Sequence, residues 1–327
     1  MKPFIKYPGG KIKEFPLVDR FKPEKISRYF EPFVGGAAIY LNIDICDSYI
    51  NDKSKDLSDL YQYIKFQDDV FFQYIKELDR LWKIIDNADT LTSSLCDIEK
   101  FDKYFNESLV FKIKKIKRLE NSGYIISQSD KDEMVLTAKK TAFYMCIRDL
   151  YNRKGIEQAK HTAYFYFIRE YCYSSMFRFS REGNFNVPYG GRSYNLKYMT
   201  SKIEQMQSNE TIKYFENTSI YNLDFEDFLN LFKLNQNDFI FLDPPYDSGF
   251  STYDQHLFDK KEQIRLLEFL KKTQAKWMMI IKKTDFIYDM YKDFYILEYD
   301  KNYLVSFKNR NIKDVKHLLI TNYAVEV

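Results

Sequence analysis

Short apolar runs that end near a glycine, proline or aspartate recur along the chain, and they predict strands. The first run, 27–34, leads into a pair of glycines, and the residues that follow, 37–43, suit a helix. A strand, a glycine turn and a helix in this order are typical of a nucleotide-binding βα unit. A second short strand is predicted at about 44–51, and it ends at Asp52.

After Asp52 the pattern changes from strand to helix. Apolar residues then follow one another at alternating steps of four and three, which places them on one face of a helix: Phe71, Ile75, Leu78, Trp82 and Ile85. Helices are predicted to predominate from there to about residue 170.

Strand-like runs return in the last third of the chain. They cover 219–225, 238–245, 277–284, 295–301 and 316–325. Between them, Asp259 and Glu262 have the spacing of a capping box, for a helix that carries the apolar residues Ile264, Leu267 and Leu270. The sequence therefore predicts an α/β fold in which a sheet domain, residues 1–56 and 216–327, is interrupted by a mostly helical domain, residues 57–215.

Positive charge is concentrated in the insertion. The whole chain has a net charge of +3, whereas residues 111–200 contain 17 Lys or Arg and 8 Asp or Glu, a net of +9. Two interpretations of the cationic run 111–119 stay open: a solvated helix face, or a surface that contacts phosphates. The segment 177–194 mixes arginines with aromatic residues, asparagine and glycine, which suits phosphate contact combined with recognition of base edges.

The composition excludes several other classes of protein. Four cysteines without C-x-x-C spacing and three distant histidines predict no metal site. The same cysteines are interpreted as reduced thiols that fill the core, and no apolar run is long enough to span a membrane. The N-terminus lacks the apolar stretch of a signal peptide, so an intracellular protein is expected.

The segment Asp243-Pro244-Pro245-Tyr246, directly after the apolar run Phe-Ile-Phe-Leu, carries the most specific chemistry. Ligands of open α/β sheets lie beyond the carboxyl ends of strands, and two prolines there fix the main chain. The Asp243 carboxylate and the Pro244 carbonyl can then accept hydrogen bonds from one NH₂ group, with Tyr246 as a flat face beside it. Such acceptors leave the nitrogen of an exocyclic amine able to attack an electrophilic methyl group. The alternative interpretation is a proline strand terminator followed by a surface tyrosine.

The glycine turn after the first strand has a different role. Small residues at Gly35 and Gly36 let a cofactor approach the main chain, and the absence of a phosphate-loop Lys and Ser/Thr argues against hydrolysis of nucleoside triphosphates. Asp52 stands 17 residues after Gly35, like the acid that binds ribose hydroxyls in dinucleotide folds. A loop or helix-capping aspartate remains an equal interpretation of Asp52.

Together these motifs resemble the Dam-type DNA adenine-N6 methyltransferases, which are S-adenosylmethionine-dependent and have a Rossmann-like sheet with an inserted target-recognition domain. Lys6 to Lys11 is similar to the family's first cofactor segment, the glycine turn to its second, and Asp243-Pro244-Pro245-Tyr246 to its catalytic motif. The resemblance implies these cofactor-binding residues: Tyr7, Gly10, Lys11, Glu31, Phe33, Gly35, Asp52, Asp224, Phe225 and Asp243.

Residues 177–190 are similar to the family's target-recognition hairpin. The residues that the resemblance and the charge pattern assign to DNA binding are Lys114, Lys115, Arg178, Phe179, Arg181, Asn186 and Pro188. The sequence departs from the family pattern at Ala37, at Phe179-Ser180 and at Lys282-Lys283-Thr284-Asp285. A glycine, a Tyr-Asn pair and a Ser-Asn pair are usual at these three places, so a target other than GATC stays open.

The predicted function is thus a site-specific enzyme that flips adenine out of double-stranded DNA and methylates its exocyclic amine, in restriction-modification or epigenetic marking. A cytosine-N4 or RNA methyltransferase and a non-catalytic DNA-binding protein are the alternatives. The resemblance further implies a monomer of bacterial or phage origin, cytoplasmic and associated with the nucleoid, with a restriction endonuclease as a functional and not a physical partner.

Overall fold

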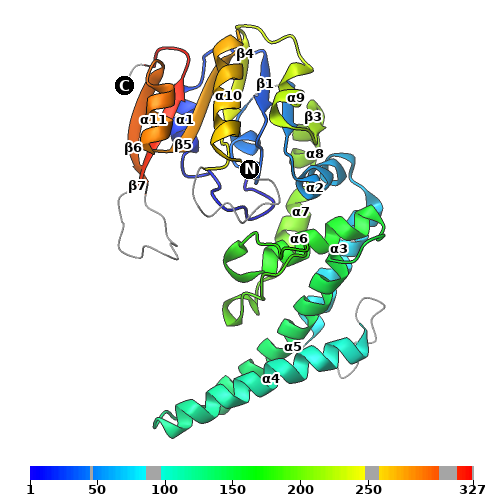
Figure 1. Ribbon diagram of the computed structural model, residues 1–327. Coiled ribbons are helices and arrows are strands. Elements are labelled where there is room, and N and C mark those ends of the chain that lie inside the picture. The colour runs from blue at the N-terminus through cyan, green and yellow to red at the C-terminus, as the bar shows by residue number, and fades with distance from the viewer. Residues whose placement is uncertain (45–46, 86–96, 247–257, 302–314, 326–327) are drawn as a thin grey trace. The chain divides into compact units, whose positions relative to one another are not determined.

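The computed structural model describes residues 1–44, 47–85, 97–246, 258–301 and 315–325 (Figure 1). The chain forms two compact units. One, the sheet unit, comprises Met1–Pro3, Gly9–Gln62 and Tyr214–Val327. The other, the helical unit, comprises Phe4–Pro8 and Tyr63–Lys213.

The sheet unit is built on one mixed sheet. The described strands are β1 (Arg28–Glu31), β2 (Asp47–Asn51), β3 (Thr218–Tyr221), β4 (Asp238–Leu242), β5 (Lys276–Lys282), β6 (Tyr295–Lys301) and β7 (Val315–Thr321), in the order β3-β2-β1-β4-β5-β7-β6. The first five are parallel, and β7 runs antiparallel to both β5 and β6. The order reverses between β1 and β4, and such a switch point is where open α/β sheets bind ligands.

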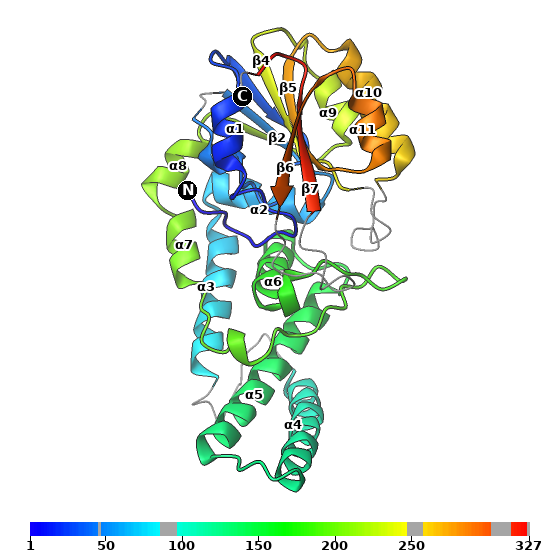
Figure 2. The same ribbon diagram turned by 90° about the vertical axis from the view of Figure 1, so that its left-hand side faces the viewer.

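Helices cover both faces of this sheet, so most residues of its central strands β1, β4 and β5 are buried. All five residues of β4 are buried, as expected for a parallel strand with covered faces. The helices α9 (Phe225–Asn230), α10 (Lys260–Lys272) and α11 (Asp285–Tyr291) pack on one face, and α1 (Phe15–Phe21) lies on the opposite face (Figure 2).

Within the helical unit, α3 (Asp69–Ile84) confirms the predicted periodicity. The five predicted apolar positions, four in the helix and Ile85 at its C-cap, are all buried, and the Asp68 side chain caps the helix by accepting from the Phe71 N–H. The other helices are α4 (Ile98–Asn121), α5 (Gln128–Tyr151), α6 (Gln158–Tyr171) and α7 (Thr200–Met206). The helices α2 (Lys55–Phe66) and α8 (Asn209–Phe215) contain the points where the chain passes from one unit to the other.

Three sequence-based expectations are corrected by the structure. Residues 37–43 form only a 3-10 turn, Tyr40–Asn42, because Gly35 and Ala37 have positive φ angles of 48° and 57° that an α-helix cannot contain. The strand expected at 219–225 ends at Tyr221, because Asp224 caps helix α9.

The third correction concerns the cysteines. Cys146 is disulfide-bonded, whereas Cys172 is a free, buried thiol whose pKa is raised by burial. The expectation of reduced thiols is therefore wrong for Cys146.

The capping prediction for α10 is confirmed, since Asp259 accepts from the Glu262 N–H at 3.1 Å, although Ile264 itself is 44% exposed.

Candidate active site

The segment Asp243–Tyr246 follows β4 directly, at the carboxyl end of a central strand. Lys11 Nζ lies 2.5 Å from Oδ1 of Asp243 and 2.9 Å from the carbonyl oxygen of Gly9. The Lys11 side chain is 2% exposed and that of Asp243 is 23% exposed. An unpaired charge in such a place is strongly destabilising, so the ion pair holds the carboxylate in one position while part of it stays open to solvent.

Further contacts fix the rest of the segment. Lys11 Nζ lies 5.1 Å from the centre of the Tyr246 ring, and the buried His317 ring meets that ring edge-on at 5.6 Å. Nε2 of Gln263, a buried residue of α10, donates to the carbonyl oxygen of Pro245 at 3.0 Å. Pro244 is buried and Pro245 is exposed. The four residues predicted to be catalytic are thus held from α10, β7 and the N-terminal part of the unit.

Hydrogen bonds to Asp52 hold the glycine turn after β1. The Gly35 N–H donates to Oδ2 of Asp52 at 2.9 Å, and the Ser54 N–H donates to Oδ1 at 2.9 Å. The Tyr61 hydroxyl donates to the Gly35 carbonyl oxygen at 2.6 Å. Asp52 is therefore a loop-capping aspartate in this structure, and its role toward a ribose stays a prediction.

Asn51 joins two of these loops, and the sequence analysis did not single it out. Its buried side-chain amide donates to the carbonyl oxygens of Pro32 and Leu223, each at 3.0 Å, and accepts from the Leu223 N–H at 2.8 Å. The loops after β1 and β3 are thereby held to the end of β2. A polar residue after Tyr49 and Ile50 at the end of β2, directly before Asp52, is the sequence signal that could have found it.

Glu31, at the end of β1, is a fully buried carboxyl group. Burial raises its pKa well above the usual range, and the nearby charges of Asp243 and Asp52 act in the same direction. The Tyr29 hydroxyl donates to its Oε2 at 2.6 Å. The carboxylates of Asp243 and Asp52 thus share this end of the sheet with a protonated carboxyl group, and their negative charge favours a cationic ligand over an anionic one.

Aromatic rings form an apolar wall at the same end of the sheet unit. Phe33 lies 5.6 Å from Phe225 and 5.5 Å from Phe258, between ring centres, and Phe258 lies 5.9 Å from Phe225. The resemblance implies the first two residues as cofactor contacts. Phe258 was not predicted, because it lies outside the predicted strands and helices and belongs to none of the recognised motifs.

For Asp224 and two residues of the first cofactor segment, the structure shows the following surroundings, and their roles toward a cofactor stay predictions. Asp224 caps α9 and pairs with Arg265 at 2.8 Å; burial alone would raise its pKa, but the Arg265 hydrogen bond and charge hold it below the usual value. Tyr7 belongs to the helical unit, where its ring lies 5.9 Å from that of Phe177, and Gly10 is exposed.

The predicted recognition segment is a hairpin in the helical unit. Phe179 pairs antiparallel with Phe185, and the Asn186 N–H donates to the carbonyl oxygen of Arg178 at 3.1 Å. Nε of Arg178 donates to Oδ1 of Asn186 at 2.8 Å, so the two side chains that were predicted to contact DNA separately form one group. Arg181, at the tip, and Pro188 are exposed.

The positive charges of the helical unit do not all lie on its surface. Lys114 and Lys115 on α4 are exposed, as a phosphate-contacting surface requires. Lys140 and Arg169 are fully buried, and Lys140 Nζ donates to the Trp82 carbonyl oxygen at 2.8 Å. The net charge of this region therefore overstates the positive surface available to DNA.

The sequence matches the family of D12 class N6 adenine-specific DNA methyltransferases over residues 7–305. The chain belongs to this family. It is an adenine-specific DNA methyltransferase, and the family implies DNA as the substrate and a methyl donor as the cofactor.

Relatives agree with this assignment over most of their length. The chain is 28% identical to the type II methyltransferase M.CviBI of Paramecium bursaria Chlorella virus NC1A over 99% of this chain and 100% of the relative. It is 25% identical to the type II methyltransferase M.MjaIII of Methanocaldococcus jannaschii over 99% of both chains. It is also 21% identical to the DNA adenine methylase of Escherichia coli K12 over 81% of this chain and 74% of the relative.

These comparisons support adenine as the target base and give no support to cytosine, RNA or a non-catalytic protein. Among the described residues of this methyltransferase, no helix is long and apolar enough to cross a membrane.

The raised pKa of Glu31 predicts a pH-dependent stability. Above the ordinary value of 4.5, the folded methyltransferase retains a proton that the unfolded chain releases, so this group contributes less stability as pH rises toward its folded pKa. Glu31→Gln cannot titrate. We expect the melting temperature of Glu31→Gln, minus that of the parent, to be larger at pH 8 than at pH 5. Glu210→Gln, at an exposed site, is the control, and equal differences at both pH values would contradict the buried, protonated carboxyl.

Proposed function

We propose that this enzyme methylates adenine at one short sequence of double-stranded DNA with S-adenosylmethionine as methyl donor, and that Asp243 is the catalytic acceptor for the target amine. The observation that supports this most is the Lys11–Asp243 ion pair of 2.5 Å directly beyond β4, with the Tyr246 ring 5.1 Å from the same ammonium. It unites an acceptor and a flat ring at the switch point of the sheet.

Asp243 acts on the target amine. Its partly exposed carboxylate accepts a hydrogen bond from the amine of an extruded adenine and stabilises the positive charge that develops on the nitrogen in the transition state. Lys11 prevents the carboxylate from rotating away. Because the acceptor is fixed before the base arrives, little reorganisation is needed during the reaction.

Tyr246 supports the extruded base. The orientation of its ring is fixed by the Lys11 ammonium and by the His317 ring, which is nearly perpendicular to it. Stacking of a base on an aromatic ring contributes about 1–3 kcal/mol, which offsets part of the cost of removing adenine from the duplex. Gln263 keeps the main chain of Pro245 in place below that ring.

The residues at the ends of β1, β2 and β3 fit S-adenosylmethionine. When bound, this cofactor supplies an electrophilic methyl group on a cationic sulfur. The carboxylates of Asp52 and Asp243 suit that cation, and the wall formed by Phe33, Phe225 and Phe258 suits its flat adenine. We assign the binding of a ribose hydroxyl to Asp52, at the loop after β2.

The helical unit carries target recognition, so residues 57–215 stay our proposed DNA-binding domain. The Arg178–Asn186 pair presents a guanidinium beside an amide on an exposed hairpin, a combination that reads base edges. Lys114 and Lys115 contribute sequence-independent contacts to phosphates. We assign the protein a place in restriction-modification, as a monomer with an endonuclease as its functional partner, because two of its relatives are named type II methyltransferases.

The catalytic assignment predicts the effect of Asp243→Asn. This change keeps the side-chain volume but removes the charge, and we expect the single-turnover rate of methyl transfer to fall by at least about 100-fold, as for the loss of one preorganised transition-state contact. The dissociation constant of S-adenosylmethionine should stay within about tenfold, because the carboxylate acts on the amine more than on the cofactor.

The matched control for this experiment is Asp238→Asn. Asp238 lies at the other end of β4 and pairs with Arg28 at 2.7 Å, so its variant breaks an ion pair of the same strand without touching the site. It should retain the parental rate. Wild-type turnover in Asp243→Asn, or equal losses in both variants, would contradict the assignment.

The hairpin geometry predicts how specificity responds to substitution. Arg178→Ala and Asn186→Ala should each reduce discrimination between the preferred site and single-mismatch duplexes by about 1–3 kcal/mol. The double variant should lose no more than the larger single effect, because Asn186 orients Arg178.

Lys114→Ala/Lys115→Ala should behave differently. It should weaken binding to all duplexes alike and reduce the salt dependence of binding. Binding titrations at several salt concentrations separate the two classes, and a uniform loss of affinity in Arg178→Ala would place that residue on phosphates instead of bases.

A further inference from the structure

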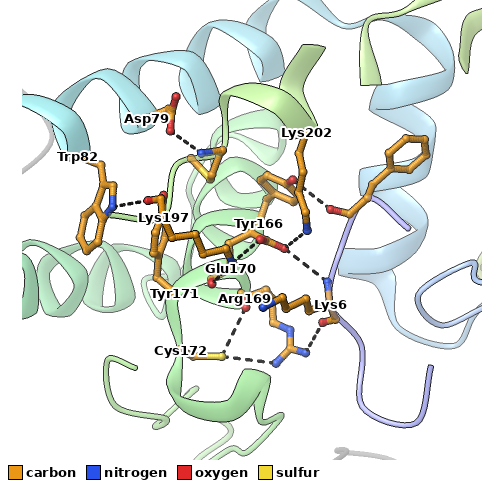
Figure 3. A network of polar contacts seen from close by, with 12 residues as sticks. Lys6, Asp79, Trp82, Tyr166, Arg169, Glu170, Tyr171, Cys172, Lys197 and Lys202 are labelled. Carbon is orange, nitrogen blue, oxygen red and sulfur yellow. Dashed lines mark hydrogen bonds and ion pairs between the residues drawn. The ribbon is translucent and has the colours of Figure 1, made fainter. Parts of the chain in front are cut away.

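The last turn of α6 contains two buried charges in succession, Arg169 and Glu170, which the proposed mechanism does not use. Both side chains are 0% exposed. Glu170 accepts from Lys197 Nζ at 2.6 Å and Lys202 Nζ at 2.7 Å (Figure 3). A buried charge destabilises the fold unless it is fully paired. The contacts of these two side chains therefore indicate what they do.

Arg169 holds two segments of main chain that are far apart in the sequence. Its Nη1 donates to the Met176 carbonyl oxygen at 2.5 Å, and its Nη2 donates to the Lys6 carbonyl oxygen at 3.0 Å. The guanidinium also lies 4.2 Å from the centre of the Phe177 ring. Met176 and Phe177 begin the recognition hairpin, so one side chain fixes both its root and the N-terminal segment.

The segment Phe4–Pro8 is held in the helical unit along its length. The side chains of Phe4 and Ile5 are buried. The Tyr166 hydroxyl donates to the Phe4 carbonyl oxygen at 3.1 Å, and the Lys6 N–H donates to Oε1 of Glu170 at 3.4 Å (Figure 3). Both hydrogen bonds are made to main-chain atoms of the segment and do not depend on its side chains. They therefore fix the position of its main chain.

The chain leaves the helical unit at the Pro8–Gly9 bond and reaches Lys11 in the sheet unit two residues later. Lys11 is the residue whose ammonium holds Asp243. Because bond lengths and peptide geometry are fixed, a shift of the main chain at Lys6 changes the path available to Lys11, and only the four residues between them can absorb it. Gly9, with a φ of 80°, already has a conformation that other residues rarely adopt.

We propose that Arg169 is a positioning residue for methyl transfer, which ties the root of the recognition hairpin to the Phe4–Pro8 segment and thereby sets Lys11 against Asp243. The ion pair is already formed without DNA. DNA that fits the hairpin leaves Lys11 in this place, whereas DNA that displaces the root of the hairpin displaces Lys11 from Asp243. Recognition therefore acts on the rate of the chemical step as well as on affinity. This inference rests on the proposed function of Asp243.

The experiment breaks the connection at two places, separately and together. It tests whether the two reductions in kcat multiply when both changes are present. Arg169→Lys keeps the charge but loses the fork that reaches two carbonyl oxygens. An insertion of Gly-Gly between Pro8 and Gly9 changes no buried side chain and only lengthens the connection. The substrate is genomic DNA from a bacterium without adenine methylation, with labelled S-adenosylmethionine, and kcat and KM for DNA are measured separately.

We expect each change to lower kcat about tenfold while KM for DNA stays within about twofold, and we expect the combined protein to lose no more than about tenfold, since both changes break one connection. The same Gly-Gly insertion after Gly123, an exposed turn between α4 and α5, should leave kcat unchanged.

Other outcomes separate the possible failures. A parental kcat in the Pro8–Gly9 insertion, or a combined loss of about 100-fold, would overturn the proposal, because independent effects multiply. A parent protein that transfers no methyl groups to DNA would instead overturn the proposed function. If Arg169→Lys fails to fold, the insertion alone decides, because it touches none of the buried contacts.

Discussion

A lysine ammonium that is almost wholly buried needs a fixed anion, and in this methyltransferase the anion is Asp243. This pair joins residues that are 232 positions apart in the chain, and it places a carboxylate beyond the end of β4. Tyr246 is oriented by the same ammonium, and the acidic surroundings of Glu31 include the same carboxylate. The geometry of the proposed acceptor and of the stacking ring therefore depends on one interaction.

Those parts of the fold that local patterns determine could be predicted from the sequence. The apolar run before Asp243 predicts β4, the steps of four and three predict α3, and Asp259 predicts the start of α10. The contacts of Asn51 and Gln263 could not be predicted, because their partners are main-chain carbonyl oxygens in distant loops and any polar residue looks alike in a local pattern.

Charge illustrates the same limit. Counting lysines and arginines predicted a basic insertion, but the count does not distinguish Lys114, which is exposed, from Arg169, which is buried and binds the protein's own main chain. Likewise, the cofactor role that the resemblance implies for Asp224 stays a prediction, and the sequence did not show that this carboxylate caps α9 and pairs with Arg265. Whether a carboxylate or guanidinium binds a ligand or holds the fold together can be decided only when its neighbours are known. Those neighbours are set by the tertiary fold.

The central claim is that this chain places a methyl group on the exocyclic amine of adenine within a defined DNA sequence. Sequencing that detects modified bases tests it most directly, on DNA from a methylation-free host that expresses the protein. The account predicts N6-methyladenine at every copy of one short motif and at no unrelated sites, and it predicts the same DNA to be unmodified when the host expresses Asp243→Asn. Methylated cytosine, or adenine methylation that persists in Asp243→Asn, would contradict it.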